Sequence, residues 1–159
     1  AQFKEREVDK RYHAIVCGRL ANDAGEIDAP IARHPVQRKM MSVQLGASRD
    51  ARTGWRVIER LAKSTLVEAT LFTGRTHQIR VHFRHIGFPL AGDALYGTKA
   101  TAQLASDTGV RPDRQMLHAR SLAFTHPASG ERLSFEAAWP SDFDQVLDAL
   151  RGAKTKTNS

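Results

Sequence analysis

The hydrophobic pattern of this chain constrains its fold more than any other feature, because apolar residues recur at every second position in one segment after another. In residues 11–19, Tyr12, Ala14 and Val16 fall on one side of an extended chain, and the residues between them fall on the other. Turn-forming residues separate this segment from the next. Similar patterns predict further strands over 27–31, 39–45, 53–60, 64–72, 117–124 and 131–137.

The period then changes in the middle of the chain. Ile79, Phe83 and Ile86 are spaced as i, i+4 and i+7, which predicts a helix over 76–86 that ends near Gly87. The remaining predicted elements are a polar surface loop with a helical turn over 98–113, a closing helix over 141–150 and a flexible basic tail over 151–159. The sum is an α+β domain with a mixed, mainly antiparallel sheet and flanking helices.

Positive charge is concentrated in one part of the chain. The 159 residues carry 24 Lys and Arg against 17 Asp and Glu, a formal net charge of +7. Residues 33–60 alone hold seven basic and two acidic residues. A localised basic surface attracts polyanions and indicates nucleic-acid binding, although the solvated surface of an ordinary basic protein is the alternative.

Cysteine content and hydropathy exclude several classes of protein. Cys17 has no second cysteine to pair with in the sequence, which is typical of a reducing compartment and excludes a disulfide scaffold. No apolar run approaches the roughly 20 residues of a membrane-spanning helix. We therefore expect a cytoplasmic protein with no membrane partner.

Residues 71–85 (LFTGRTHQIRVHFRH) concentrate three Arg and three His. A zinc site is disfavoured, because only His82 and His85 share a helical face and neither an HExxH motif nor a Cys pair completes a ligand set. The glycine pattern does not fit a phosphate-binding P-loop. A merely solvated basic helix and an anion-binding helix start after Gly74 both stay open on the pattern alone.

A resemblance to a known family rests on this stretch. Residues 73–82 (TGRTHQIRVH) and 85–97 (HIGFPLAGDALYG) closely resemble the RluA-type family of RNA pseudouridine synthases, and only Phe88 departs, standing where the family usually has His. Three further segments match the family pattern in order, at 10–18, 25–31 and 117–127. The resemblance covers about 3–150 and implies a pseudouridine synthase-like catalytic domain.

The resemblance implies an activity and a partner. The family converts uridine in RNA to pseudouridine without cofactor or metal, after flipping the target nucleotide out of its stack. Ribosomal RNA is expected more than transfer RNA, and the usual state is a monomer.

The resemblance also implies roles for individual residues. Tyr12 matches the active-site tyrosine that stacks on the base and is implicated in removing the C5 proton. Arg80 matches the arginine that pairs with the nucleophilic aspartate, and Leu117 matches a wall of the uracil pocket. Arg75, His77 and Gln78 are expected beside the pocket as substrate-binding residues. The expected contacts to the RNA backbone are Arg33, Arg38, Lys39, Arg52 and Arg56.

The nucleophile itself is missing from the sequence. The family places this aspartate in an HRLDxxTSG motif upstream of the first strand, and no such motif occurs here. We therefore expect 1–150 to be a catalytic domain without its N-terminal part, inactive alone, with an open sheet edge and exposed apolar surface. The alternatives are a non-catalytic RNA-binding relic of the same fold and, from another class, a metal-dependent hydrolase built on the histidines.

Overall fold

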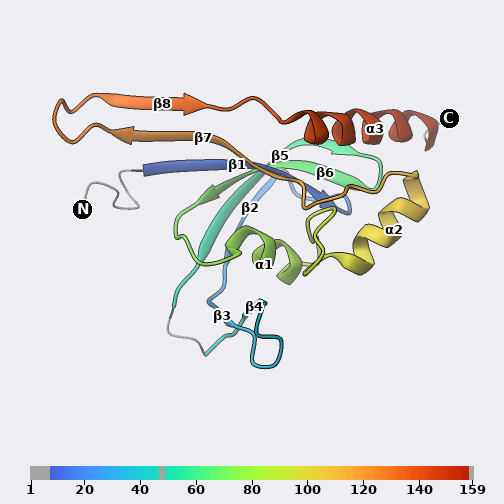
Figure 1. Ribbon diagram of the computed structural model, residues 1–159, viewed down its shortest axis with the longest axis horizontal. Coiled ribbons are helices and arrows are strands. Elements are labelled where there is room, and N and C mark those ends of the chain that lie inside the picture. The colour runs from blue at the N-terminus through green and yellow to red at the C-terminus, as the bar shows by residue number, and fades with distance from the viewer. Residues whose placement is uncertain (1–7, 47–48, 158–159) are drawn as a thin grey trace.

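The computed structural model describes residues 8–46 and 49–157, and its centre is a six-stranded antiparallel sheet (Figure 1). The strands follow the order β2-β5-β6-β1-β7-β8. They are β1 (Val8–Cys17), β2 (Ala24–Asp28), β5 (Arg52–Leu61), β6 (Ser64–Leu71), β7 (Leu117–Thr125) and β8 (Arg132–Glu136). A separate β3–β4 hairpin joins β3 (Ile31–Arg33) to β4 (Met41–Val43). The α+β class expected from the pattern is confirmed.

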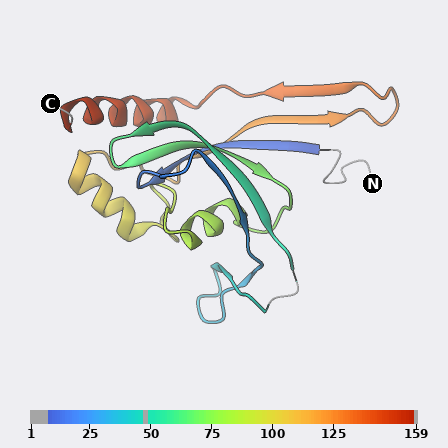
Figure 2. The ribbon, with the colours of Figure 1, turned by 180° about the vertical axis from the view of Figure 1, so that it is seen from behind.

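Helices cover both faces of the sheet. Helix α1 (Gln78–His85) packs Ile79 and Phe83 against Ala14 and Val16 of β1, on the face that also carries Val67 and Ala69. Helix α3 (Ser141–Thr157) packs against the opposite face. Figures 1 and 2 show α1 and the β3–β4 hairpin on the same side of the sheet.

Side chains of β1 contribute to two hydrophobic clusters, one on each face of the sheet. Ala14 and Val16 are buried in the cluster under α1, whereas Ile15 and Cys17 are buried in the cluster under α3. This confirms the predicted division of 11–19 into two sides, which follows from the alternation of side chains along a strand.

Two predictions for the C-terminal half were wrong. The stretch expected as a polar loop contains α2 (Thr98–Thr108), which buries only Thr101 and Leu104 and so shows little apolar periodicity in the sequence. The closing helix α3 continues past 150 to Thr157, so 151–157 are helical rather than tail. A bidentate ion pair between Arg151 and Glu59 of β5, with a shortest distance of 2.8 Å, holds the start of this added segment to the sheet.

The β7–β8 hairpin extends beyond the rest of the sheet (Figure 2). In the described ranges, β8 pairs with β7 alone, which leaves its other edge open. Phe135 of β8 is 56% exposed and stacks on Phe124 of β7, with ring centroids 6.0 Å apart. No helix in the described ranges is both long and apolar enough to cross a membrane.

Candidate functional site

Tyr12 and Leu117 lie on the same face of the sheet, under α1. Tyr12 pairs with Ala69 of β6 and Ala119 of β7, and Leu117 pairs with Ala14 of β1 two positions further along. Both side chains are partly buried against the cluster that contains Ile79 and Phe83 of α1. The sequence prediction that these two residues flank one pocket is therefore compatible with the fold.

A polar cavity of about 240 Å³ lies at the end of this face. Lys10 lines it from β1, two residues before Tyr12 and therefore on the same side of the strand. The loop after β6 also lines it, with Thr73, Gly74 and Arg75. The predicted substrate-binding Arg75 is thus placed at this cavity, and its Nε donates to the carbonyl of Asp50 at 2.8 Å.

Gln78 holds the loop that precedes α1. Its Oε1 accepts hydrogen bonds from the Thr73 hydroxyl at 2.6 Å and from the Arg75 backbone N–H at 3.0 Å. Its Nε2 donates to the Arg52 carbonyl at 2.9 Å and to Thr53 Oγ1 at 3.0 Å. An amide with both donors and both lone pairs engaged has little to offer a ligand. The predicted contact between Gln78 and substrate is disfavoured by this hydrogen bonding, which instead positions Arg75.

His82 is built into the core in the same way. It is fully buried, its Nε2 donates to the Ala29 carbonyl at 2.8 Å, and its Nδ1 lies 2.8 Å from Thr53 Oγ1. Burial lowers the pKa of His82, which keeps the ring neutral. Among the described residues, no group of three or more His, Cys, Asp or Glu is arranged to hold a metal ion.

Arg80 points from α1 to Asp93, thirteen residues later. Two hydrogen bonds of 2.8 Å, from Nε to Oδ2 and from Nη2 to Oδ1, make a bidentate pair. The Asp93 side chain is fully buried, and that of Arg80 is 13% exposed. Burial raises the pKa of Asp93, but the hydrogen bonds from Arg80 and from the backbone N–H groups of Tyr96 and Leu95 outweigh it and lower that pKa overall. The pair is therefore ionised.

Local geometry fixes the position of Asp93. Gly92 has φ +81°, and a Cβ at this position would lie 2.0 Å from the Arg114 carbonyl oxygen. Only glycine fits such an approach. Asp93 Oδ1 also accepts from the N–H groups of Leu95 and Tyr96, both at 3.0 Å. Nη1 of Arg80 has no partner among the described residues, so its N–H groups remain available to donate to a second anion.

His77 precedes α1 with φ 56°, a left-handed conformation that is uncommon for a residue with a side chain. Its Nδ1 lies 2.7 Å from the hydroxyl of Tyr96, and the two rings meet edge to face. Burial and then the nearby positive charge of Arg80 lower the pKa of His77. The predicted substrate-binding residue is therefore a neutral, half-buried ring.

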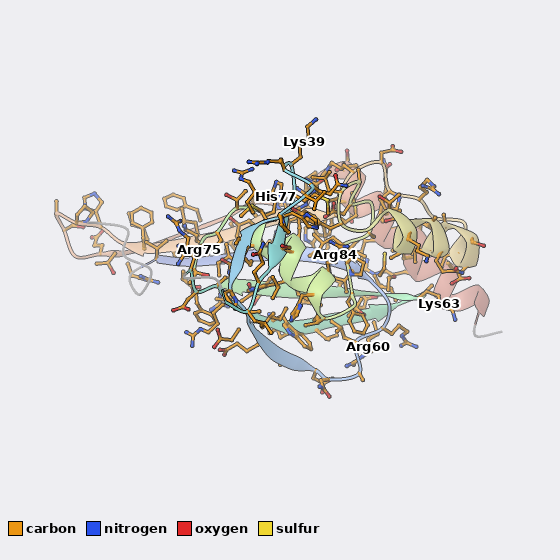
Figure 3. All side chains as sticks on the ribbon, turned by 90° about the horizontal axis from the view of Figure 1, so that it is seen from below. Lys39, Arg60, Lys63, Arg75, His77 and Arg84 are labelled. Atoms are coloured by element: carbon orange, nitrogen blue, oxygen red, sulfur yellow. The ribbon has the colours of Figure 1, made fainter. Side chains whose placement is uncertain are left out.

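The five predicted RNA-backbone residues do not form one surface. Arg33, Arg38 and Lys39 are exposed on the β3–β4 hairpin, beside α1. Figure 3 shows Lys39 projecting on one side of the molecule, with Arg60 and Lys63 on the other. Residues that are close in the sequence can lie on different sides of a protein when the chain changes direction between two strands.

Arg52 and Arg56 lie on β5, and each already has an acidic partner within the protein. Arg52 stacks over the Phe72 ring, 4.2 Å from its centroid, and pairs with Glu26 at 3.4 Å. Arg56 pairs with Glu68 at 3.1 Å on the sheet face that also bears His13, opposite to the Tyr12 face. This register turns Arg56 away from the face that bears α1, and its contact with the RNA backbone stays a prediction.

Sequence reasoning missed the part that Asp93 and Tyr96 play beside α1. In the sequence, both are only members of the 85–97 pattern, which by itself assigns them no chemical role. Yet Asp93 is the ion-pair partner of Arg80, and the Arg80 guanidinium lies 5.0 Å from the centroid of the Tyr96 ring. The signal available in the sequence was a carboxylate in the Gly-rich loop that follows the Arg-containing helix.

Comparison with known proteins identifies the family. A family model described as RNA pseudouridylate synthase matches residues 1–85, more than half of the chain. The chain is 47% identical over 150 residues to ribosomal large subunit pseudouridine synthase D of Nitrosomonas europaea, covering 94% of this chain and 43% of that protein. It is 43% identical over 150 residues to an uncharacterized RNA pseudouridine synthase of Bacillus subtilis, covering 94% and 46%. The chain thus spans less than half the length of these curated relatives.

A solved structure agrees with the sequence comparisons. The fold matches human RNA Pseudouridylate Synthase Domain Containing 1 with a TM-score of 0.72 and 29% identity, over 94% of this chain and 68% of that one. On the family-model match and these relatives, this chain belongs to the RNA pseudouridylate synthase family.

Proposed function

We propose that the full protein containing this chain converts uridine to pseudouridine in RNA, with ribosomal RNA as the favoured substrate class. The observation that carries the proposal is the Arg80 guanidinium, which is nearly buried, oriented by Asp93 and left with Nη1 unpaired among the described residues. A fixed cation with spare donors is suited to hold a second carboxylate ionised in a closed site. The relatives named as pseudouridine synthases support the same reaction.

The reaction needs a nucleophile, a surface for the base and a proton acceptor. The N1–C1′ bond breaks and its electron pair stays on N1 of the freed uracil. The uracil turns, C5 bonds to C1′, C5 then gives up its proton, and N1 takes one up, so that the product is an isomer of the substrate. We assign Tyr12 to stacking on the uracil and to removal of the C5 proton, and Leu117 to the wall of the pocket. Both lie on the sheet face under α1 that ends at the polar cavity. The target nucleotide reaches them by flipping from its stack.

The nucleophilic aspartate is proposed to come from a segment outside this sequence. Asp93 is a poor candidate, because it is fully buried and its oxygens already accept four hydrogen bonds. A carboxylate from another segment would reach Arg80 at Nη1, the side that Asp93 leaves open. We therefore expect residues 1–159 alone to bind RNA without catalysing its isomerisation.

Release of tritium tests this proposal, since a label at C5 of uridine is lost only when C5 forms the new bond. Large-subunit ribosomal RNA labelled at C5 is incubated with the intact protein and, separately, with residues 1–159. We expect release from the intact protein and none from the isolated chain, with RNA retained on a filter in both cases. Retention without release by the intact protein would instead favour the non-catalytic RNA-binding alternative.

A further inference from the structure

Tyr96 joins three segments that are distant in the sequence. It is 5% exposed and follows Asp93 in the loop between α1 and α2. Its hydroxyl oxygen accepts a hydrogen bond from the backbone N–H of Met41, the first residue of β4, at 2.8 Å. The same hydroxyl lies 2.7 Å from Nδ1 of His77, directly before α1. One phenol group thus connects the β3–β4 hairpin to the start of the helix that carries Arg80.

The hydrogen bonds around this hydroxyl determine where His77 carries its proton. A backbone N–H can only donate, so the phenol oxygen is the acceptor toward Met41. The single phenol proton then needs an acceptor of its own, and among the described residues only Nδ1 of His77 is within reach. A neutral imidazole that accepts at Nδ1 must carry its hydrogen on Nε2.

The ring of His77 is held in place as well as in one tautomer. The Tyr96 ring meets it edge to face, with centroids 5.5 Å apart and an interplanar angle of 76°. The left-handed backbone at φ 56° costs free energy for a residue with a side chain, and such positions persist only where surrounding contacts determine them. Both observations indicate a side chain that the fold presents in one orientation.

The surroundings of His77 favour a phosphate as the group it meets. Its Nε2 has no partner among the described residues, and the side chain is only half-buried. Arg75 precedes it by two residues, and the β3–β4 hairpin that packs on α1 bears the exposed Arg38 and Lys39. Figure 3 shows His77 in the region bounded by Arg75, Lys39 and Arg84. A donor amid cations meets RNA most readily at the backbone.

We propose that Tyr96 is a positioning residue for RNA binding, whose hydroxyl fixes His77 as a hydrogen-bond donor at Nε2 for a phosphate oxygen of the RNA. The Met41 hydrogen bond ties this donor to the hairpin, so that the hairpin cations and His77 meet the same stretch of backbone. The proposal rests on the proposed function only in taking RNA as the ligand.

The tautomer of His77 can be measured on the unmodified full-length protein. Nitrogen-15 NMR of labelled histidine distinguishes an Nε2–H ring from an Nδ1–H ring and from the charged form, and the His77→Gly variant assigns the signal by its loss. Glycine is chosen because it tolerates the left-handed backbone. We expect a neutral Nε2–H ring at pH 7. A proton on Nδ1, or a charged ring, overturns the proposal without any need for a Tyr96 variant.

Tyr96→Phe then tests the hydroxyl, since it retains the ring over Arg80. Filter binding to large-subunit ribosomal RNA should weaken by about five- to tenfold, the effect of one hydrogen bond. In a His77→Gly background the same substitution should cost clearly less affinity, because only the hydrogen bond to Met41 is then left for the hydroxyl to act through. Thr108→Val, which removes a hydroxyl hydrogen bond in α2, is the matched control and should leave affinity unchanged.

Each result decides the matter. Wild-type affinity in Tyr96→Phe, or an equal further loss in the His77→Gly background, overturns the proposal. Should Tyr96→Phe not fold, the tautomer and the affinity of His77→Gly decide instead, and unchanged affinity in His77→Gly rejects the role of His77. RNA affinity is read independently of tritium release, so a protein that binds RNA without catalysis would refute the proposed function and leave this inference testable.

Discussion

Asp93→Asn is the substitution that best tests the reasoning about Arg80. The change keeps the size of the side chain and one oxygen for the backbone N–H groups, but it turns an NH₂ donor toward the guanidinium and removes its counter-charge. With Asp93 fully buried and Arg80 13% exposed, the free energy of unfolding should fall by about 3 kcal/mol, the lower end of the range for breaking a buried ion pair.

The assay is urea unfolding of the intact protein, followed by circular dichroism, with Asp142→Asn as the matched control. Asp142 forms an equally short bidentate pair with Arg114, but the two side chains are 49% and 40% exposed. Solvent screens such a pair, so the control should lose much less stability. Equal losses in the two variants would refute the view that burial makes the Arg80 pair important.

The pH dependence of the Asp93→Asn effect follows from the sign of the pKa shift. The folded pKa of Asp93 lies below its usual value of 3.8. A carboxyl of this kind stabilises the fold fully above the unfolded pKa and loses that contribution as pH falls through the folded one. The difference in stability between the natural protein and Asp93→Asn should therefore be constant near pH 7 and shrink below about pH 4. A difference that grew on acidification would contradict the assignment.

Three further outcomes are expected. Arg80→Ala in the intact protein should lower turnover by at least about 100-fold while RNA affinity stays close to normal, as tritium release and filter binding would show; near-normal turnover would remove Arg80 from the site. The logarithm of RNA affinity should fall linearly with the logarithm of salt concentration, with a slope reduced by about one in Lys39→Ala but not in Arg56→Ala, because Arg56 is paired with Glu68. Burial raises the pKa of the Cys17 thiol to about 11, so alkylation at pH 8 should be slow in the native protein and fast in urea, and rapid native labelling would contradict its burial.

Local pattern was sufficient for the strands and for the first helix. Alternation along 11–19 is a property of adjacent residues, so the two sides of β1 could be assigned before any neighbour was known. The spacing of Ile79 and Phe83 likewise identified the buried face of α1. The pattern at 98–113 was too polar for the same reasoning, because α2 buries only Thr101 and Leu104.

The candidate site was only partly predictable. Motif resemblance selected Tyr12, Arg80 and Leu117, and their roles stay predictions. The resemblance could not show that the side-chain amide of Gln78 is fully hydrogen-bonded within the protein. Its four partners belong to a turn and a strand that come together only when the chain folds. Hydrogen-bond capacity is a property of a side chain, whereas its use depends on the surroundings.

By itself, therefore, the sequence determined the periods, the turns and the location of positive charge, all of which depend on residues a few positions apart. Tertiary structure alone decided which charged side chains form ion pairs within the protein and which remain available to a ligand. The register of β5 against β6 turns Arg56 toward Glu68, and the Gly92 turn brings Asp93 to Arg80. Electrostatic interactions and hydrogen bonds act over a few ångströms in space, and the number of residues between two groups does not determine that distance.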